Sequence, residues 1–407
     1  MNRFLTLSLC CILCACAKER PAKPTKSATA ITENTATTLE APFLRVNSSE
    51  ALEGTVLLKQ DTSKFFNDRF WQGIPTVTSS KGGILYAAWY SGANGEGVGN
   101  FVTVSVSTDQ GITWKNNELI INPDSNLRFF DPVLWTDKYN HVILFFNKAR
   151  GRIWDGKGGV WAMSLMYNAA TDSIAYTQAM RLSNGVMQNK PVDTNDGSST
   201  LFPIALWKFT GFASGVYLYQ SVYNEALKRA DQFFQMSVVP FAESERTYDE
   251  HQVIQLKDGY YVMLRGRYGL YYMRKGYNDI GWGPTKKFLD MTNTSSRFTL
   301  WRLKSGRIAL IINNSLYTRE NLTIYLSSDE MKTWSYGMLI DVRKKVTYPD
   351  MVQTPDGRIN VIYDHERFID KNIQFVSFTE KDVIQNKPEN ITRVLISGNA
   401  LMQNLKK

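Results

Sequence analysis

Short apolar stretches separated by polar turns recur along most of this chain. A run rich in β-branched and aromatic residues follows each turn, and no long helical period interrupts the pattern. Successive turns lie roughly 47–62 residues apart, which leaves room for about four strands in each interval. The six turns contain Lys81-Gly82-Gly83, Asp137 to Asn140, Asp196-Gly197, Asp258-Gly259, Ser305-Gly306 and Asp356-Gly357. The pattern therefore predicts an all-β chain built of six repeats.

Self-similarity at this period is typical of a β-propeller, in which each four-stranded blade buries its faces against its neighbours. Six repeats predict a six-bladed β-propeller over residues 45–407. The first strand of each blade lines the central channel, so residues at the same offset in each repeat should meet at one mouth of it. On that argument Asp131, Lys190, Glu250, Arg297 and Tyr348 face one another. The alternative for some of them is a role in capping turns or lining a water-filled channel.

A second repeated element is a tight turn of the form S-x-D-x-G-x-T-W. It spans Ser107 to Trp114, and Ser327 to Trp334 is a copy in which Met331 replaces the glycine. The serine and aspartate of such a turn can hydrogen-bond their own backbone, and the glycine supplies a positive φ. Asp109 is therefore predicted to be a turn residue. These segments resemble the Asp-box of the sialidase superfamily.

The N-terminal region has a different composition from the repeats. Residues 1–16 hold an apolar run that is too short to span a bilayer, which predicts a signal peptide. The run ends Leu13-Cys14-Ala15-Cys16, which resembles a bacterial lipobox and implies lipidation of the Cys16 thiol. Residues 17–44 have few large apolar side chains and predict a flexible tether. We expect a lipid-anchored protein of the cell envelope that meets the membrane only through this lipid, with ordinary secretion as the alternative.

The cysteine positions and the charge limit the classes of function. All four cysteines lie within residues 1–16, which excludes a disulfide framework and a thiolate metal site from the propeller. We expect no metal and no cofactor. The formal net charge is +9, which could favour an acidic substrate, although an ordinary solvated surface explains it as well. No motif indicates nucleic-acid binding.

Five residues of the repeats resemble the catalytic machinery of bacterial and animal sialidases, over roughly residues 65–380. Tyr348 in T-Y-P-D-M-V resembles the family's nucleophilic tyrosine, and Glu250 in E-H-Q-V-I-Q resembles its partner glutamate. Arg265 and Arg319 resemble two arginines of the triad that binds the substrate carboxylate. Glu96 lies in a glycine-rich loop where the family places its acid/base aspartate. The resemblance implies a six-bladed propeller that cleaves terminal sialic acid from glycans.

These residue types suit that chemistry. Sialic acid carries a carboxylate on its anomeric carbon, and a neutral phenol meets less repulsion there than a carboxylate nucleophile would. A free tyrosine has a pKa near 10, so Tyr348 needs a neighbouring base, which would be Glu250. Glu96 would protonate the leaving oxygen and then activate water. Arginines suit a carboxylate because their planar fork can donate two parallel hydrogen bonds.

The resemblance fails at one place. Sialidases begin the first blade with R-I-P, whose arginine belongs to the carboxylate-binding triad, whereas this chain has Gly73 before Ile74-Pro75. Loss of one charge-assisted donor weakens carboxylate binding by about 1.5–3 kcal/mol. Arg69 or Arg128 could substitute for it. The further candidates for substrate contact are Arg128, Lys190, Arg297 and His251.

We expect a retaining exo-glycosidase of sialidase type, acting on a terminal acidic sugar such as sialic acid. One alternative is a lyase or hydrolase of uronate-bearing polysaccharide, in which a tyrosine or His251 shuttles the proton. The other is a non-catalytic surface lipoprotein that captures acidic glycans, because the missing arginine and the degraded Asp-boxes suit a protein without activity.

Overall fold

The computed structural model describes residues 43–44, 46, 48–59, 69–92, 95–151, 158–207 and 214–404. Contacts divide the chain into Met1–Ala36 and Thr37–Lys407, and every described residue belongs to the second unit. The predicted signal peptide and Cys16 lie outside the described residues, as does all but the end of the predicted tether. That end, Phe43 and Leu44, is buried, and Leu44 forms a parallel bridge with Ala230. The described part of the chain therefore includes two residues that the sequence assigned to the tether.

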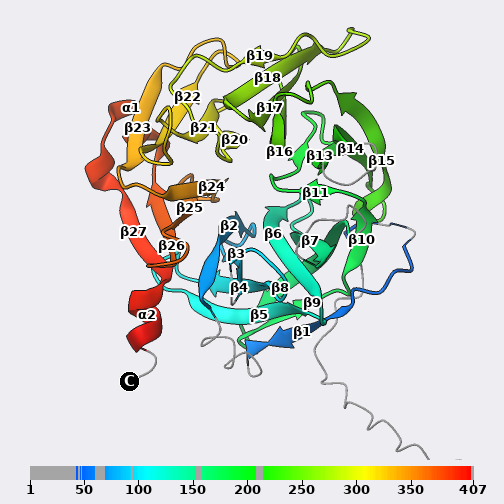
Figure 1. Ribbon diagram of the computed structural model, residues 1–407, viewed down its shortest axis with the longest axis vertical. Helices are drawn as coiled ribbons and strands as arrows, with labels where there is room; N and C mark the ends of the chain where they lie inside the picture. Colours follow the sequence, from blue (N-terminus) through cyan, green and yellow to red (C-terminus); the bar gives the residue numbers. More distant parts are fainter. Residues whose placement is uncertain are drawn as a thin grey trace, which may run out of the picture. The chain divides into compact units, whose positions relative to one another are not determined.

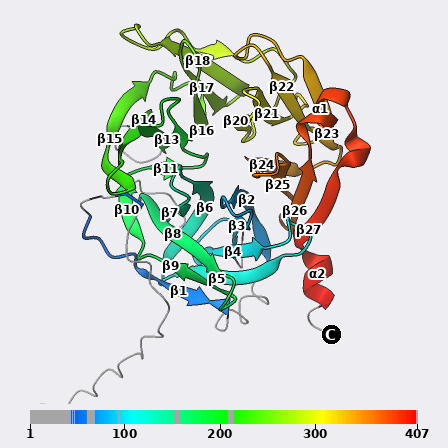
Figure 2. The same ribbon diagram turned by 180° about the vertical axis from the view of Figure 1, so that it is seen from behind.

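Six antiparallel sheets stand around a central channel in the described part of the chain (Figures 1 and 2). The prediction of an all-β, six-bladed propeller is confirmed. From the channel outward, the first blade comprises β2 (Trp71–Ser79), β3 (Leu85–Gly92), β4 (Phe101–Ser107) and β5 (Lys115–Pro123). The second blade comprises β6 (Leu127–Thr136), β7 (Val142–Arg150) and β8 (Val160–Asn168), with β9 (Ser173–Tyr176) and β10 (Met180–Ser183) both paired with β8. The third blade begins with the short strands β11 (Val186–Met187) and β12 (Val192–Asp193) and continues with β13 (Ser199–Leu206), β14 (Gly215–Asn224) and β15 (Arg229–Val239).

The last three blades each have four strands in chain order. They are β16 (Arg246–Gln255), β17 (Gly259–Gly266), β18 (Gly269–Gly276) and β19 (Lys286–Lys287); β20 (Thr299–Arg302), β21 (Ile308–Asn313), β22 (Leu322–Ser327) and β23 (Tyr336–Asp341); and β24 (Val346–Gln353), β25 (Ile359–His365), β26 (Asn372–Phe378) and β27 (Thr392–Ser397). Two helices lie near the C-terminus, α1 (Glu380–Gln385) and α2 (Asn399–Asn404), with the short 3-10 helix η3 (Pro388–Asn390) between them. No described helix has both the length and the apolar character needed to cross a membrane.

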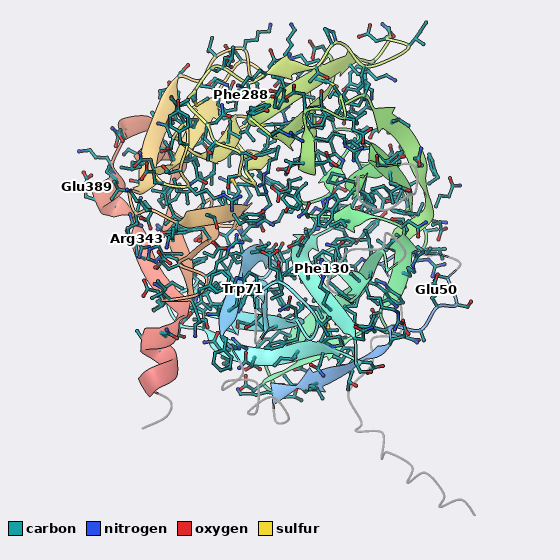
Figure 3. All side chains as sticks on the ribbon, in the orientation of Figure 1. Glu50, Trp71, Phe130, Phe288, Arg343 and Glu389 are labelled. Atoms are coloured by element: carbon teal, nitrogen blue, oxygen red, sulfur yellow. The ribbon has the colours of Figure 1, made fainter. Side chains whose placement is uncertain are left out.

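The inner strands of the first blade are buried along their length because neighbouring blades cover both of their faces. Every residue of β2 and β3 is buried, whereas the outermost strand β15 mixes buried and exposed positions. Trp71 and Phe130 lie within the ring and are almost fully buried, while Glu389 lies at its outer edge (Figure 3). Burial of such a large side chain contributes about 1.5–3 kcal/mol, so the faces between blades hold the ring together.

Hydrogen bonds from backbone N–H groups to side-chain carboxylates close the ring between its first and last blades. In the described residues, β1 (Gly54–Leu58) joins the outer edge of the first blade, and the last blade is built only of β24 to β27. Across this seam, Ile74 N donates to Asp364 Oδ2 over 2.7 Å and Val77 N donates to Asp350 Oδ2 over 2.9 Å. Two buried carboxylates thus join strands that are distant in the sequence.

The Asp-box segments are tight turns between the two outer strands of a blade. Asp109 Oδ1 accepts a hydrogen bond from Thr113 N over 2.9 Å, and Ser107 Oγ accepts one from Gly111 N over 2.9 Å. Gly111 has a φ of +87°, and a Cβ there would lie 2.3 Å from Phe375 Cε1 of the last blade. In the second copy Met331 adopts the same kind of conformation, with a φ of +61°. The Asp109 carboxylate therefore belongs to the turn.

Candidate active site

Three inner strands carry a residue with a positive φ directly before a proline. The residues are Ile74 (φ +57°), Asp131 (φ +46°) and Tyr348 (φ +54°). Proline has no N–H to donate to the ladder, and the strand register shifts at each of the three places. Such a conformation costs roughly 1–3 kcal/mol in a non-glycine residue. All three residues line one cavity. The strained bulges therefore occur where equivalent positions of three repeats come together.

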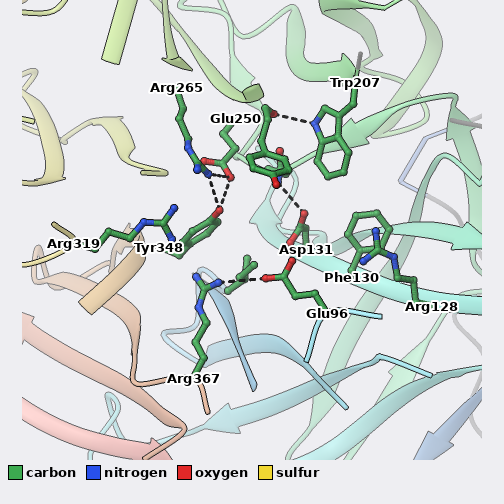
Figure 4. A pocket seen from close by; sticks show the side chains of 13 residues that line it. Glu96, Arg128, Phe130, Asp131, Trp207, Glu250, Arg265, Arg319, Tyr348 and Arg367 are labelled. Atoms are coloured by element: carbon green, nitrogen blue, oxygen red, sulfur yellow. Dashed lines mark hydrogen bonds and ion pairs between the residues drawn. The ribbon is translucent and has the colours of Figure 1, made fainter. Parts of the chain in front are cut away.

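That cavity has a volume of about 450 Å³ and is lined by side chains from several blades (Figure 4). Of the residues that the sequence predicted, it brings together Tyr348, Glu250, Asp131, Glu96, Arg265, Arg319 and Arg128. The wall is completed by Ile74, Phe130, Gln188, Trp207, Tyr248 and Arg367. Four arginines and three carboxyl groups therefore surround it, and no three His, Cys, Asp or Glu side chains in the described ranges are grouped as metal ligands would be.

Tyr348, Glu250 and Arg265 form a closed hydrogen-bonded triangle (Figure 4). Tyr348 Oη donates to Glu250 Oε1 over 2.5 Å, and Arg265 Nη1 donates to that oxygen over 2.8 Å and to Tyr348 Oη over 3.0 Å. Burial opposes the charge of Glu250, but Arg265, the Tyr348 hydroxyl and Arg319 outweigh it and lower the pKa of this carboxyl. Burial, followed by the Glu250 charge, raises the pKa of the Tyr348 phenol. A neutral phenol thus donates to an ionised carboxylate.

The local strand structure places Glu250 beside Arg265. The register pairs Asp249 of β16 with Arg265 of β17, and it shifts on both sides of this pair. Asp249 and Glu250 both have a positive φ, and Arg246 holds Asp249 in a buried ion pair at 2.7 Å. The double bulge turns the Glu250 side chain into the channel, where Tyr348 reaches it from the last blade.

Residues 83–361 match the family model described as a BNR repeat-like domain. The chain belongs to this BNR repeat-like family. Its propeller is similar to that of the Hadza microbial sialidase Hz136, at 15% identity and a TM-score of 0.60 over 78% of this chain and 67% of that one. It is also similar to NanB with Optactamide, at 13% identity and a TM-score of 0.56 over 81% and 71% of the two chains.

A third similar structure is a protein of unknown function from Dyadobacter fermentans, at 14% identity and a TM-score of 0.55 over 78% of this chain and 95% of that one. No curated protein matches this chain by sequence. At these identities the likeness shows a shared fold, so this BNR repeat-like protein has a propeller of the sialidase type.

Two further carboxyl groups of the BNR repeat-like protein face the Tyr348–Glu250 pair across the cavity. The Glu96 side chain is 48% exposed, and its Oε1 lies 3.4 Å from Arg367 Nη1. Asp131 is buried, accepts a hydrogen bond from Gln188 Nε2 over 2.8 Å, and has no partner for Oδ1 among the described residues. Burial, followed by the charges of Glu96 and Glu250, raises the pKa of Asp131 to about 7. Asp131 can therefore hold a proton near neutral pH.

An aromatic wall that the sequence did not reveal lines part of the cavity, with Trp207 and Phe130 on the side away from Tyr348 (Figure 4). The Trp207 ring lies 5.5 Å from that of Tyr248 and 6.3 Å from that of Phe130, and its Nε1 donates to Tyr248 O over 2.9 Å. Arg128 stacks on Phe130 at 4.3 Å. The sequence positions of these aromatic residues were the one available indication of the wall. Tyr248 comes two residues before Glu250, and Trp207 directly follows β13. Such a wall offers apolar surface to a sugar ring.

Three predicted contact residues are not part of the cavity wall. Lys190 forms a buried ion pair with Asp350, the carboxylate that also closes the ring. Arg297 donates to three backbone carbonyls, among them that of Tyr348, and lies beneath the Tyr348 ring at 4.9 Å. His251 Nε2 lies 2.8 Å from Tyr217 O, and burial lowers its pKa to about 4.

Each of these three groups has partners inside the fold and none lines the cavity, so the expectation that they contact the substrate stays a prediction. His251 lies in β16, Lys190 lies between β11 and β12, and Arg297 lies two positions before β20. The shared offset in the repeat predicted these places, but it did not predict the direction of each side chain.

Neither position 73 nor Arg69 supplies the arginine that the sequence found missing. Arg69 is buried against Trp89 and Phe101, outside the cavity. The third arginine near Tyr348 is instead Arg367, whose guanidinium carbon lies 4.4 Å from the centre of the Tyr348 ring. The sequence offered one signal, because Arg367 follows the second strand of its blade as Arg319 does in the preceding one.

Proposed function

We propose that this BNR repeat-like protein is a retaining exo-glycosidase of sialidase type that removes a terminal acidic sugar, sialic acid or a related one, from a glycan. The observation that carries the proposal is the 2.5 Å hydrogen bond from Tyr348 Oη to the ionised Glu250, with Arg265 bound to both oxygens. A tyrosine paired with a base is the arrangement that a nucleophilic phenol requires. The BNR repeat-like family and the sialidase-type propeller support it.

In the first step Tyr348 Oη attacks the anomeric carbon and its proton passes to Glu250. The bond from that carbon to the leaving oxygen breaks, and Glu96 gives its proton to the leaving oxygen. The sugar is then bound covalently to Tyr348. Arg265 stays within hydrogen-bond distance of the oxygen on which negative charge develops, and this lowers the energy of the transition state.

In the second step a water molecule attacks the anomeric carbon from the side that the leaving group vacated. Glu96, now ionised, takes the proton of that water, and Tyr348 leaves as a phenolate that regains its proton from Glu250. Two displacements at one carbon give net retention of configuration. The partly exposed position of Glu96 suits this role, because the leaving group and the water must both reach it.

The charges around the cavity favour an acidic sugar. Arg265, Arg319 and Arg367 surround Tyr348, while Asp131 lies on the far side and Glu96 lies 3.4 Å from Arg367 (Figure 4). Among the residues that the structure describes, Arg319 donates one hydrogen bond, to Ser295 O, which leaves most of its N–H groups for a ligand. A substrate carboxylate beside Tyr348 would meet three guanidinium groups.

The test is release of 4-methylumbelliferone from its α-glycoside of N-acetylneuraminic acid, with β-glucuronide and α-galacturonide substrates beside it. We expect turnover by the wild type and a loss of roughly 10³-fold or more in kcat for Tyr348→Phe. The matched control is Tyr317→Phe, because Tyr317 is 90% exposed and does not line the cavity. Turnover that survives Tyr348→Phe contradicts the nucleophile, and glycan binding without turnover of any substrate favours the capture protein. Release of an unsaturated product would indicate a lyase.

We also propose that Cys16 is lipidated and anchors the protein in the cell envelope, at the periplasmic or outer surface. The support is the lipobox-like Leu13-Cys14-Ala15-Cys16 segment after an apolar run. Labelling of cells with an alkyne fatty acid should mark the wild type but not Cys16→Ser. Equal labelling of both, or recovery of unlabelled wild type from the medium, would contradict the anchor.

A further inference from the structure

Gly73 and Arg367 lie in contact, although 294 positions separate them in the sequence. A Cβ at position 73 would lie 2.9 Å from both Cδ and Nε of Arg367 and 3.0 Å from its Cγ. Gly73 is not one of the glycines with a positive φ, so its backbone does not require glycine. The absence of a side chain at position 73 therefore leaves space, and the Arg367 side chain occupies that space.

The guanidinium of Arg367 is held firmly at the edge of the cavity. Its Nε donates to Asp364 Oδ2 over 3.0 Å, and its Nη2 donates to Thr347 Oγ1 over 2.9 Å. Asp364 is fully buried, and the same oxygen accepts the hydrogen bond from Ile74 N that closes the ring. The loss of side-chain entropy on ligand binding is therefore small, because the folded protein already fixes this arginine.

Arg367 keeps hydrogen-bonding capacity for a ligand. A guanidinium has five N–H donors, and three are engaged by Asp364, Thr347 and, at 3.4 Å, Glu96. One N–H on each terminal nitrogen has no partner among the described residues. Two such groups on one planar fork match the two oxygens of a carboxylate.

Three successive blades place an arginine where the second strand meets the third. Arg265 lies next to the end of β17, Arg319 lies between β21 and β22, and Arg367 lies between β25 and β26. All three surround Tyr348 (Figure 4), with cation–ring distances of 5.5 Å for Arg319 and 4.4 Å for Arg367. The regular position means that one fold-level offset delivers three cations to one side of the cavity.

We infer that Arg367 is the third arginine that binds the substrate carboxylate, and that Gly73 leaves the space it needs. The inference rests on the proposed function for the identity of the acidic sugar. The third guanidinium group thus comes from Arg367 of the last blade, and its side chain occupies the space beside Gly73 of the first blade. A side chain at position 73 and the native Arg367 side chain compete for the same space.

The test is calorimetric binding of N-acetylneuraminic acid, glucuronic acid and galacturonic acid, each compared with its methyl ester. The ester keeps the sugar but removes the charge, so the ratio of the two affinities isolates carboxylate recognition. We expect Arg367→Ala to weaken binding of the acid roughly tenfold to a hundredfold and to leave binding of the ester unchanged. Arg307→Ala is the control, because Arg307 pairs with Glu380 outside the cavity.

Two further variants test the coupling between the two positions. Gly73→Arg alone should lower Tm and the acid-over-ester ratio, because two side chains compete for one space. The exchange variant Gly73→Arg/Arg367→Gly should restore the ratio to within a few-fold of the wild type. Arg367→Lys, which keeps the charge but not the fork, covers the case of an exchange variant that does not fold. It should keep part of the preference for the acid.

The outcomes separate this inference from the proposed function. An acid-over-ester ratio that Arg367→Ala leaves unchanged, or a Gly73→Arg variant with wild-type Tm and binding, overturns the inference even if sialosides are cleaved. Binding of an acidic sugar that depends on Arg367, without turnover, supports the inference and overturns the enzyme. A wild type that binds none of the three acids overturns both.

Discussion

Tyr348 Oη lies 2.5 Å from Glu250 Oε1, although the two residues stand on the inner strands of the sixth and fourth blades, 98 positions apart. The pair forms across the channel because both strands bulge at this level and both residues have a positive φ. Arg265, adjacent to Glu250 through the strand register, holds the two oxygens together. The reactive group is therefore a product of ring closure.

Glu250→Gln should lower kcat by roughly 10²–10⁴-fold with little change in KM. The substitution keeps the shape of the side chain, and the amide oxygen can still accept a hydrogen bond from Arg265. It removes the base that accepts the Tyr348 proton. The pKa of Glu250 is lowered, so the carboxylate should stay ionised until the pH falls below the usual pKa range of a glutamate. The wild type should therefore lose activity through protonation of Glu250 only below that range. Steady-state kinetics from pH 4 to 8 measure both effects. Glu389→Gln, at the exposed outer edge, is the control, and equal activity of the two variants would contradict the assignment.

Glu96→Gln should impair substrates in proportion to the basicity of the leaving group. A sialylated disaccharide needs a proton on its leaving oxygen and should lose roughly 10²–10⁴-fold in kcat/KM. The 4-methylumbelliferyl glycoside has an acidic leaving group and should lose far less in the first step. Comparison of the two substrates on one enzyme preparation measures the difference. Equal losses on both would assign Glu96 to binding, and a retained rate on the disaccharide would exclude it as the acid.

Asp131→Asn should change the pH dependence of stability. Asp131 has a pKa of about 7 in the folded protein, above the value of about 3.9 for a free aspartate. The unfolded chain loses this proton first, so the folded state binds more protons between these values and stability falls as pH rises through them. The variant lacks this penalty, so its Tm relative to wild type should rise by several degrees between pH 4 and 8. Thermal unfolding across that range measures it, and a constant difference in Tm would show that Asp131 titrates normally.

Gly111→Ala should destabilise the propeller by about 1–3 kcal/mol. The methyl group would meet Phe375 of the last blade, and alanine would have to adopt a φ of +87°. Gly82→Ala is the matched control, because its nearest contact would be Ser80 Oγ at 3.8 Å and its φ is not positive. Chemical denaturation of both variants gives the comparison. Equal stabilities would mean that the seam beside the first Asp-box adapts freely.

The repeat in the sequence was sufficient for the fold. Turn spacing and apolar strand runs predicted six blades because each blade repeats the same local preferences and the same need for neighbours on both faces. The same offset argument predicted that Glu250, Tyr348 and Asp131 meet at one mouth, and prolines after Asp131 and Tyr348 mark the bulges. What an offset does not contain is the direction of each side chain, and so Lys190, Arg297 and His251 were expected in a cavity that they do not line.

The sequence by itself determined the architecture, the level of the channel where the site lies and the residue types for a phenol–carboxylate pair, because these follow from local patterns repeated along the chain. The tertiary structure decided which groups share electrostatic surroundings. The pKa of Asp131 depends on burial and on Glu96 and Glu250, which come from two other blades. Arg367 meets Gly73 only where the last blade closes on the first. Contacts of that kind depend on ring closure, and no short stretch of sequence encodes them.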